Sequence, residues 1–307
     1  MIKTDGVWDS TEERILFSAG SLIDSVVNQA NRSSVELDQS MTMIASENRK
    51  SFHKLVSLRD YDHKSSGGKR KKMDFDLESY DSLFLDSGVF GVAMDHAKAH
   101  GLSHNEALNT PLKKIDDWNR FYAMYVETCL EYKDRLWGYV ELDLGGTTQK
   151  QATREGLEKL GLHPIPVWHP LTDGLEYGEY LMSTYDRICL GNLVKSDIRT
   201  RLTVLRAMAR IKQNHRHVWV HALGLGMCEL ALCFPINSCD AITWMGPLMW
   251  PTRHSYSLAT QFRDDGRFYS GEENSQYFMA YFLLEAQVRS NEQNWRAYDA
   301  AKLAAAH

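Results

Sequence analysis

The chain has 307 residues, of which 43% are hydrophobic and 24% are charged, so it can bury the core of a large globular protein. Its net charge of −5 excludes a global basic field, and any contact with nucleic acid must use a local patch. Its five cysteines form no CxxC pair, and their odd number argues against a disulfide framework. The start of the chain has no apolar signal segment, and no apolar run approaches the roughly 18 residues of a membrane span. We therefore expect a soluble protein of a reducing, cytoplasmic compartment that does not contact a membrane.

Eight short apolar runs alternate with helical patterns along most of the chain. The expected strands are Ile15–Ala19, Met41–Ala45, Leu83–Leu85, Tyr139–Asp143, Ile165–His169, Arg187–Gly191, His217–Gly224 and Asp240–Trp244. The expected helices include Leu112–Leu136, Gln149–Leu160, Leu175–Thr184 and Asp197–Lys212. This alternation predicts parallel βαβ units with right-handed crossovers. Eight such units favour a closed (β/α)8 TIM barrel, an α/β fold, over an open sheet.

We expect one domain over residues 1–307, with the barrel over about 15–250 and a helical extension over about 250–307. A basic, glycine-containing loop at 63–72 is inserted before the third strand. This loop is either a solvated surface segment or a phosphate-gripping one. The basic residues that would contact a nucleic-acid backbone are Lys64, Lys69, Arg70, Lys71 and Lys72.

The run Leu83–Leu85 ends at Asp86, which Ser87 and Gly88 follow as turn residues. A carboxylate at the carboxyl end of a buried strand has a raised pKa, which suits a general acid/base. The alternative is that Asp86 caps the next helix.

The other strands also end in residues that can do chemistry. In barrels of this kind the site lies at the carboxyl ends of the strands. The side chains and turns expected there are Asp86, Asp143, His169, Gly191, Asn192, Leu193, Gly224, Gly226 and Asp240, the last at the start of its own run. Paired carboxylates without a hydroxyl or thiol nucleophile motif indicate glycosyl chemistry, in which one attacks the anomeric carbon and the other moves a proton. Exposed glycine backbone suits a flat ligand.

Structural interpretations of the same residues stay open. Asp143 could cap the helix at Thr147, His169 could be a hydrogen-bonded rim residue, and the glycines could serve tight turns. The alternating His215, His217 and His221 are not expected to form a metal site, and no metal ligand set is predicted.

Four segments in chain order resemble the tRNA-guanine transglycosylases. L-D-S-G-V-F at Leu85–Phe90 resembles the D-S-G-G-F-Q segment that carries the proton-handling Asp of that family, and R-I-C-L-G-N-L resembles its glycine-rich base-binding turn. H-A-L-G-L-G is similar to its L-M-G-V-G strand, and S-C-D-A-I-T-W lies where the family has its nucleophilic Asp. The resemblance covers about residues 83 to 245.

This chain also departs from the family pattern. Val89 and Gly91 replace the second Gly and the Gln of D-S-G-G-F-Q, and His169 stands at the position that resembles the base-reading Gln. No cysteine follows Cys239, so the family's zinc motif is not apparent. The compact length and the Y-V-E-L-D-L and P-V-W-H segments look like the DNA branch, the 7-deazaguanine DNA transglycosylases of phages and bacterial DNA-modification islands.

The resemblance implies a glycosyltransferase (pentosyltransferase) that exchanges guanine in DNA for a 7-deazaguanine such as 7-cyano-7-deazaguanine. Asp240 would be the nucleophile and Asp86 the proton-handling residue, while Asp143, His169 and the Gly191–Leu193 and Gly224–Gly226 turns would bind the base. The partners are double- or single-stranded DNA and the free base, no cofactor is expected, and the oligomeric state stays open. Such a DNA modification, in a bacterium or a phage-infected host, would protect against restriction.

Three other functions are compatible with the same residues. The chain could be a queuine- or archaeosine-type tRNA-guanine transglycosylase that lacks zinc, or a non-catalytic nucleic-acid-binding subunit. The presence of both Asp86 and Asp240 argues against the second. A barrel hydrolase unrelated to nucleic acid would require the four motif matches to be accidental.

Overall fold

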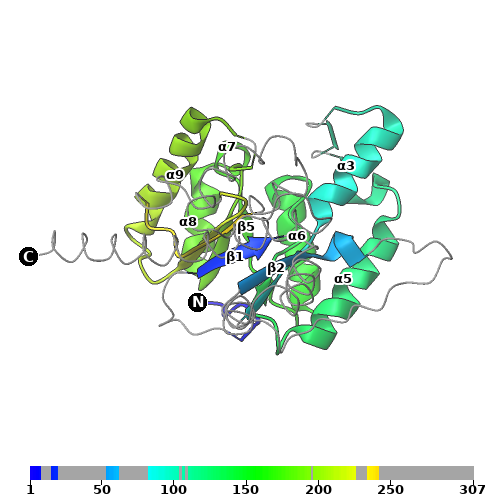
Figure 1. The fold of residues 1–307 in the computed structure, drawn as a ribbon, viewed down its shortest axis with the longest axis horizontal. Helices are drawn as coiled ribbons and strands as arrows, with labels where there is room; N and C mark the ends of the chain where they lie inside the picture. Colours follow the sequence, from blue (N-terminus) through cyan, green and yellow to red (C-terminus); the bar gives the residue numbers. More distant parts are fainter. Residues whose placement is uncertain are drawn as a thin grey trace, which may run out of the picture.

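The computed structural model describes residues 1–7, 15–19, 53–61, 82–103, 106–107, 110–194, 196–225 and 234–241 of the chain. The fold of these residues is mixed α/β, with parallel strands that are connected through helices (Figure 1), which confirms the predicted class. In this part of the chain no helix combines the length and the apolar character that crossing a membrane requires. The prediction of a single domain stays untested, because residues 242–307 lie outside the described residues.

Within the described ranges, eight strands form one sheet in which every pair is parallel. They are β1 (Ile15–Ala19), β2 (His53–Ser57), β3 (Ser82–Asp86), β4 (Gly138–Tyr139), β5 (Val167–Trp168), β6 (Arg187–Leu190), β7 (Trp219–Ala222) and β8 (Ser238–Ala241). Their order in the sheet is β4-β3-β2-β1-β8-β7-β6-β5. The first strand therefore pairs with the second on one side and with the eighth on the other.

Hydrogen bonds also link the residues around the end of β4 with Ile165, which precedes β5; β4 and β5 are the two end strands of this order. Val140 and Ile165 form a parallel bridge, in which the Ile165 N–H donates to the Tyr139 carbonyl at 2.8 Å. The Glu141 N–H returns a hydrogen bond to the Ile165 carbonyl at 3.0 Å. One buried cluster collects side chains from most of the strands: Phe17, Leu55, Phe84, Trp137, Val140, Ile165, Val167, Cys189 and Trp219.

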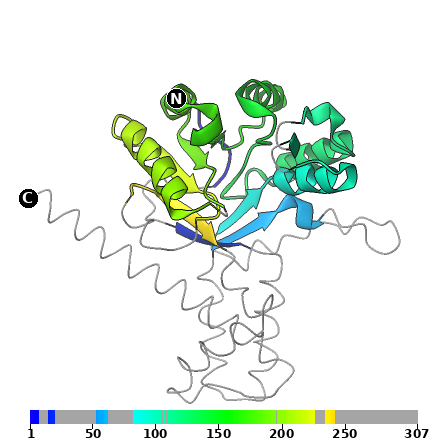
Figure 2. The ribbon, with the colours of Figure 1, turned by 90° about the horizontal axis from the view of Figure 1, so that it is seen from above.

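Helices lie in an arc outside the described strands (Figure 2). They are α3 (Val89–His100), α5 (Trp118–Tyr132), α6 (Gly146–Glu158), α7 (Pro170–Asp173), α8 (Leu175–Thr184) and α9 (Ile198–Lys212), with 3-10 turns η1 (Leu58–Tyr61) and η3 (Leu112–Lys114). The prediction for α8 is confirmed at both ends. In α9 the buried Val204, Leu205 and Met208 face the sheet at helical spacing, and the Asp197 side chain caps the first turn through the Thr200 N–H at 2.9 Å. The single helix predicted over Leu112–Leu136 is instead η3 followed by α5, because Asp117 adopts a left-handed conformation with φ 58°.

The strand between β1 and β3 is His53–Ser57, which the sequence analysis did not predict. The predicted strand Met41–Ala45 lies outside the described residues. An apolar pattern does not predict β2, because the strand begins with the polar residues His53 and Lys54. In the structure Lys54 is buried, and a ring nitrogen of the half-buried His53 lies 2.7 Å from the Ser82 hydroxyl.

Several other strand boundaries differ from the prediction, among them those of β4, β5, β7 and β8. The strand β5 begins only after Pro166, because proline has no N–H to donate to the ladder. The strand β8 begins two residues earlier than predicted, so Asp240 is its third residue rather than its first.

The amino-terminal residues pack against the amino ends of the strands. Arg187, the first residue of β6, is fully buried, and its guanidinium donates to the Thr4 hydroxyl at 2.7 Å, to the Asp5 carbonyl at 2.7 Å and to the Trp137 carbonyl at 2.6 Å. Asp186 accepts from both the N–H and the hydroxyl of Thr4 at 3.0 Å. These contacts cover the end of the sheet that lies away from the carboxyl ends of the strands.

Candidate active site

Asp86 is the last residue of β3, as the sequence predicts. Its carboxylate accepts a hydrogen bond from the Gly88 N–H at 3.2 Å. The helix α3 that follows has Gly88 as its N-cap and no side-chain cap, so the helix-cap interpretation of Asp86 is wrong. Asp86 is therefore available for another role at the carboxyl end of the sheet.

The pKa of Asp86 is raised from its ordinary value of 3.8 to about 7. Burial is the largest cause, and the negative charges of Asp143 and Asp240 add to it, while hydrogen bonds from Gly88 and Ser57 act in the opposite direction. The carboxyl keeps some solvent contact but is otherwise surrounded by protein. At neutral pH about half of the molecules carry the proton, which is the condition under which a carboxyl both donates and accepts protons. The influence of Asp143 and Asp240 also shows that the three predicted carboxylates converge.

Asp143 and His169 form a pair, with Asp143 four residues beyond the end of β4 and His169 directly after β5. The His169 Nε2 lies 3.3 Å from the Asp143 Oδ2, and both side chains are partly exposed. Burial acts to raise the pKa of Asp143, but the hydrogen bond and charge of His169 and the charge of Lys150 outweigh it, so this pKa is lowered. Neither side chain caps a helix: α6 has Gly145 as its N-cap, and His169, which is the N-cap residue of α7, makes no side-chain cap bond. The site thus holds two carboxyls with different pKa values: Asp86, which is about half protonated at neutral pH, and Asp143, which is ionised. Such a separation of pKa values is typical of acid/base sites.

Asp240 is buried and held by two donors. The Gly224 N–H donates to its Oδ1 at 2.6 Å, and the His221 Nε2 lies 3.3 Å from the same oxygen. His221 is fully buried, with its other ring nitrogen 2.9 Å from the Ser238 hydroxyl and its edge against the ring of Phe84. The carboxylate therefore has a fixed orientation on a rigid strand.

The turn after β6 holds the His169 ring in place. A Cβ atom on Gly191 would lie 1.9 Å from the His169 Cδ2, so only glycine leaves room for this ring. Asn192 adopts φ 62°, and its side-chain oxygen accepts from the Leu171 N–H at 3.2 Å. The Leu193 side chain is fully buried and its carbonyl accepts from Arg201 at 3.2 Å, so that part of the turn serves the protein interior.

The turn after β7 also has an internal role, since the Gly224 N–H that was expected to face a base is bonded to Asp240. Gly224 has φ 63°, a conformation that favours glycine. The remaining predicted site residues, Gly226, Lys64, Lys69, Arg70, Lys71 and Lys72, lie outside the described residues.

Behind the Asp143–His169 pair lie two buried ion pairs that the sequence analysis did not identify. Lys150 contacts Asp173 at 2.5 Å and the Val167 carbonyl at 3.0 Å, and Asp173 accepts from the His169 N–H at 2.8 Å. Arg154 contacts Glu141 at 2.6 Å, and Glu141 also accepts from the Val167 N–H at 2.7 Å. Burial raises the pKa of Glu141 despite the charges of Arg154 and Lys150. This network fixes the end of β5 and so the position of His169.

His221 and Ser57 are the other residues of the site that the sequence analysis missed. The sequence analysis treated His221 only as a possible metal ligand together with His215 and His217. Its position three residues before Gly224, near the end of β7, could have placed it in the site. Among the described residues, the ligand atoms that lie close enough to hold a metal ion are on His96, His100 and Asp116, away from the three carboxylates.

No protein-family model matches the chain, and no curated protein matches it. The interpretation of the site therefore depends on its own geometry: a carboxyl with a pKa near neutrality, a second, ionised carboxylate paired with an imidazole, and a third carboxylate held rigidly between donors. This arrangement can protonate a leaving group, bind a pair of N–H donors and attack an electrophilic carbon.

Proposed function

We propose that the chain is a (β/α)8-barrel transglycosylase that exchanges guanine in DNA for a 7-deazaguanine. The closed barrel is supported by the parallel bridge between Val140 and Ile165, which lie beside the two end strands of the sheet order. It is also supported by the cluster around Phe17, Phe84 and Trp137, because side chains from most strands meet there as the interior layers of a barrel do.

The observation that carries the proposed chemistry is the raised pKa of Asp86 under the charges of Asp143 and Asp240. Target guanine would be flipped out of the stack into the carboxyl end of the barrel, at a cost of a few kcal/mol. The Asp240 carboxylate attacks C1′ of the deoxyribose while the bond from C1′ to N9 of guanine breaks. Asp86, which holds a proton in about half of the molecules at neutral pH, protonates the departing base.

The second half of the exchange reverses these roles. The N9 of the incoming 7-deazaguanine attacks C1′, breaks the ester bond to Asp240 and gives its proton to the Asp86 carboxylate. Two displacements at C1′ retain the configuration, and Asp86 and Asp240 return to their starting states. The proposed reaction uses no cofactor.

Asp143 is the base-reading residue in this proposal. Its lowered pKa keeps it ionised, and an ionised carboxylate accepts hydrogen bonds from both N1–H and the exocyclic amine of guanine. His169 positions Asp143, and Gly191 leaves the room that His169 needs. Gly224 holds the nucleophile rather than the base.

DNA is favoured over tRNA by the lack of cysteines after Cys239, since the tRNA enzymes carry their zinc motif there. A modification of this kind, made in a bacterium or a phage-infected host, would protect DNA against restriction. The test incubates the purified protein with duplex DNA, or with tRNA, and 7-cyano-7-deazaguanine, followed by mass spectrometry of the digested nucleosides. We expect modified deoxynucleosides with the wild type and with Asp134→Ala, an exposed control, and none with Asp240→Ala.

If tRNA is modified and DNA is not, the substrate of the enzyme is tRNA rather than DNA. No modified nucleoside in either polymer, from folded wild-type protein, would refute the transglycosylase.

A further inference from the structure

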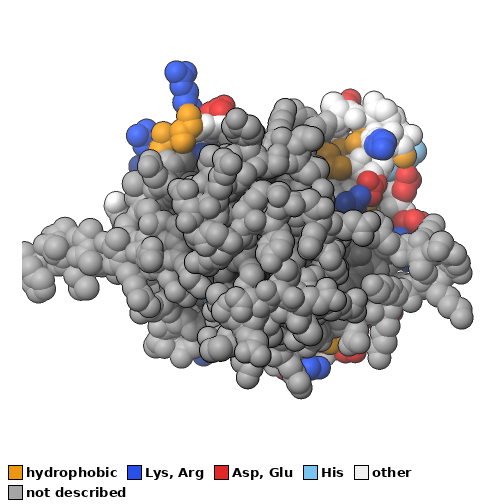
Figure 3. Space-filling model, in the orientation of Figure 1, with side chains coloured by type: hydrophobic (Ala, Val, Ile, Leu, Met, Phe, Trp, Pro, Cys, Tyr) orange, Lys and Arg blue, Asp and Glu red, His pale blue; other side chains and the backbone are white. Residues whose placement is uncertain are grey.

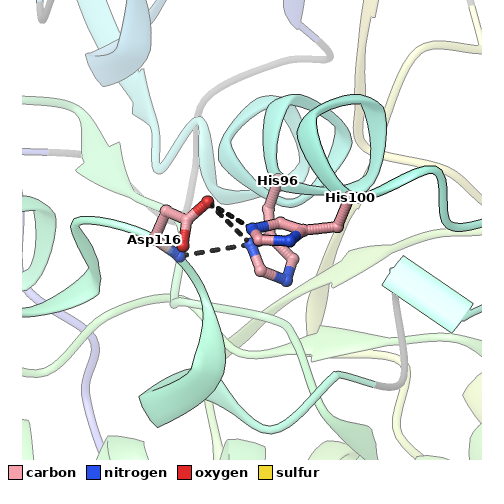
Figure 4. A group of neighbouring side chains, drawn as sticks. All are labelled: His96, His100 and Asp116. Atoms are coloured by element: carbon pink, nitrogen blue, oxygen red, sulfur yellow. Dashed lines mark hydrogen bonds and ion pairs between the residues drawn. The ribbon is translucent and has the colours of Figure 1, made fainter.

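A second cluster of polar side chains lies at the far end of α3. His96 and His100 are one helical turn apart, and Asp116 comes just before α5 (Figure 4). The Asp116 Oδ2 lies 2.8 Å from the His100 Nε2 and 3.2 Å from the His96 Nδ1. The two imidazole rings have their centroids 4.4 Å apart. Three side chains from two segments therefore point at one position.

We propose that His96, His100 and Asp116 bind a divalent transition-metal ion of the zinc class. One ligand atom from each residue lies within 4.8 Å of the others. Zinc bonds of roughly 2.0–2.1 Å in a tetrahedral arrangement place ligand atoms about 3.4 Å apart. The Asp116 Oδ2 lies 2.8 and 3.2 Å from the two histidine nitrogens, slightly closer than that value, so small rotations of the side chains are enough to admit the ion.

The ligand types also suit a metal. Two imidazoles and one carboxylate are a ligand set that zinc binds in proteins. The backbone N–H of Asp116 donates to the His96 Nδ1 at 3.3 Å, so an ion bound at this nitrogen would take the place of that hydrogen bond.

The cluster is open to solvent on one side. His96 is buried, but His100 is 50% exposed and Asp116 is 59% exposed, which leaves a fourth coordination position for water. A histidine and side chains of both charges lie at the surface over α3 in Figure 3. The nearby Asp95 and Asp117 are paired with Arg59 and Arg120 and do not crowd the position.

This site is separate from the three carboxylates and independent of the proposed exchange reaction. The helix α3 starts next to Asp86, and His96 lies seven residues beyond its first residue, or about 10 Å along the helix. A metal at its far end would brace α3 against the start of α5. The expected effect of the metal is therefore on the stability of this helix pair rather than on chemistry at C1′.

The test uses the full chain, freed of metal with a chelator and titrated with zinc chloride by calorimetry. We expect one zinc ion per chain for the wild type, and at least a tenfold loss of affinity in His100→Gln and in Asp116→Asn, two exposed positions whose substitution spares the core. His217→Gln is the matched control, because His217 is an exposed histidine outside the cluster, and it should bind as the wild type does. Cobalt(II) should give a visible absorption band with the wild type and lose it in the two variants.

Thermal unfolding supplies a second measurement. Zinc should raise the Tm of the wild type and of His217→Gln, and leave the Tm of His100→Gln unchanged. Absence of zinc binding by the wild type, or equal affinity in the wild type and both cluster variants, would overturn the proposal.

Discussion

Asp86→Asn is expected to stabilise the folded protein while it removes most of the exchange activity. Moving the pKa of a carboxyl from 3.8 to about 7 means that its ionised form is disfavoured in the folded state by about 4 kcal/mol, at about 1.4 kcal/mol per tenfold change in proton affinity. This loss is absent below pH 3.8, where the folded and unfolded chains are both protonated. The loss of stability grows as the pH rises from 3.8 to 7 and is complete above pH 7. An asparagine keeps the shape and an acceptor for the Gly88 N–H but cannot ionise.

The assay is urea unfolding of the wild type, Asp86→Asn and the exposed control Asp134→Asn at pH 5 and pH 8. The stability of the wild type relative to Asp86→Asn should fall by about 2.5 kcal/mol between these two pH values, whereas its stability relative to Asp134→Asn, which retains Asp86, should not change. Base exchange by Asp86→Asn should fall by about 10²- to 10⁴-fold, which is the usual contribution of general acid/base catalysis. Equal pH dependence of the three proteins would refute the raised pKa, and wild-type exchange by Asp86→Asn would refute its catalytic role.

Three further predictions concern the remainder of the site. Asp240→Ala should give no exchange and no covalent DNA adduct on a denaturing gel, whereas an adduct trapped with this variant would assign the nucleophile elsewhere. Gly191→Ala should displace the His169 ring and lower kcat/KM by about 10²-fold, since misplacement by ~1 Å has this effect, and an unchanged kcat/KM would contradict it. Replacing the basic residues at 69–72 by alanine should weaken DNA binding equally across sequences and reduce the salt slope by roughly 0.9 per lost phosphate contact. An unchanged slope would identify a solvated loop.

The positions of the candidate site residues could be predicted because parallel strands bring their carboxyl ends together. The apolar runs before Asp86 and Asp143 place these two carboxylates at one edge of the sheet, whereas Asp240 was expected at the start of its own run and is instead the third residue of β8. Their proximity then follows from topology, and the raised pKa of Asp86 agrees with it. The helix α8 has both of its predicted ends, because a regular apolar period in the sequence also predicts a helix well.

Features that depend on contacts between distant residues could not be predicted. Lys54 and His221 are polar residues on buried strand positions, so an apolar pattern gives no signal for them. Lys150 and Arg154 look like solvated residues of an amphipathic helix, and only the positions of Asp173 and Glu141 show that they point into the protein. The role of Gly224 could not be predicted either, because it depends on the Asp240 carboxylate that its N–H binds.

The pairing of β1 with β8 has a consequence for the order in which this protein folds during synthesis. Ile15 is in register with Ser238, so the partner of the first strand is translated roughly 220 residues later. At about 5–20 residues per second, this edge of β1 waits about 10 to 45 s on the ribosome for its hydrogen bonds. An unpaired parallel strand edge is a site of aggregation. Slow translation between β1 and β8 therefore lengthens the interval in which the nascent chain depends on chaperones.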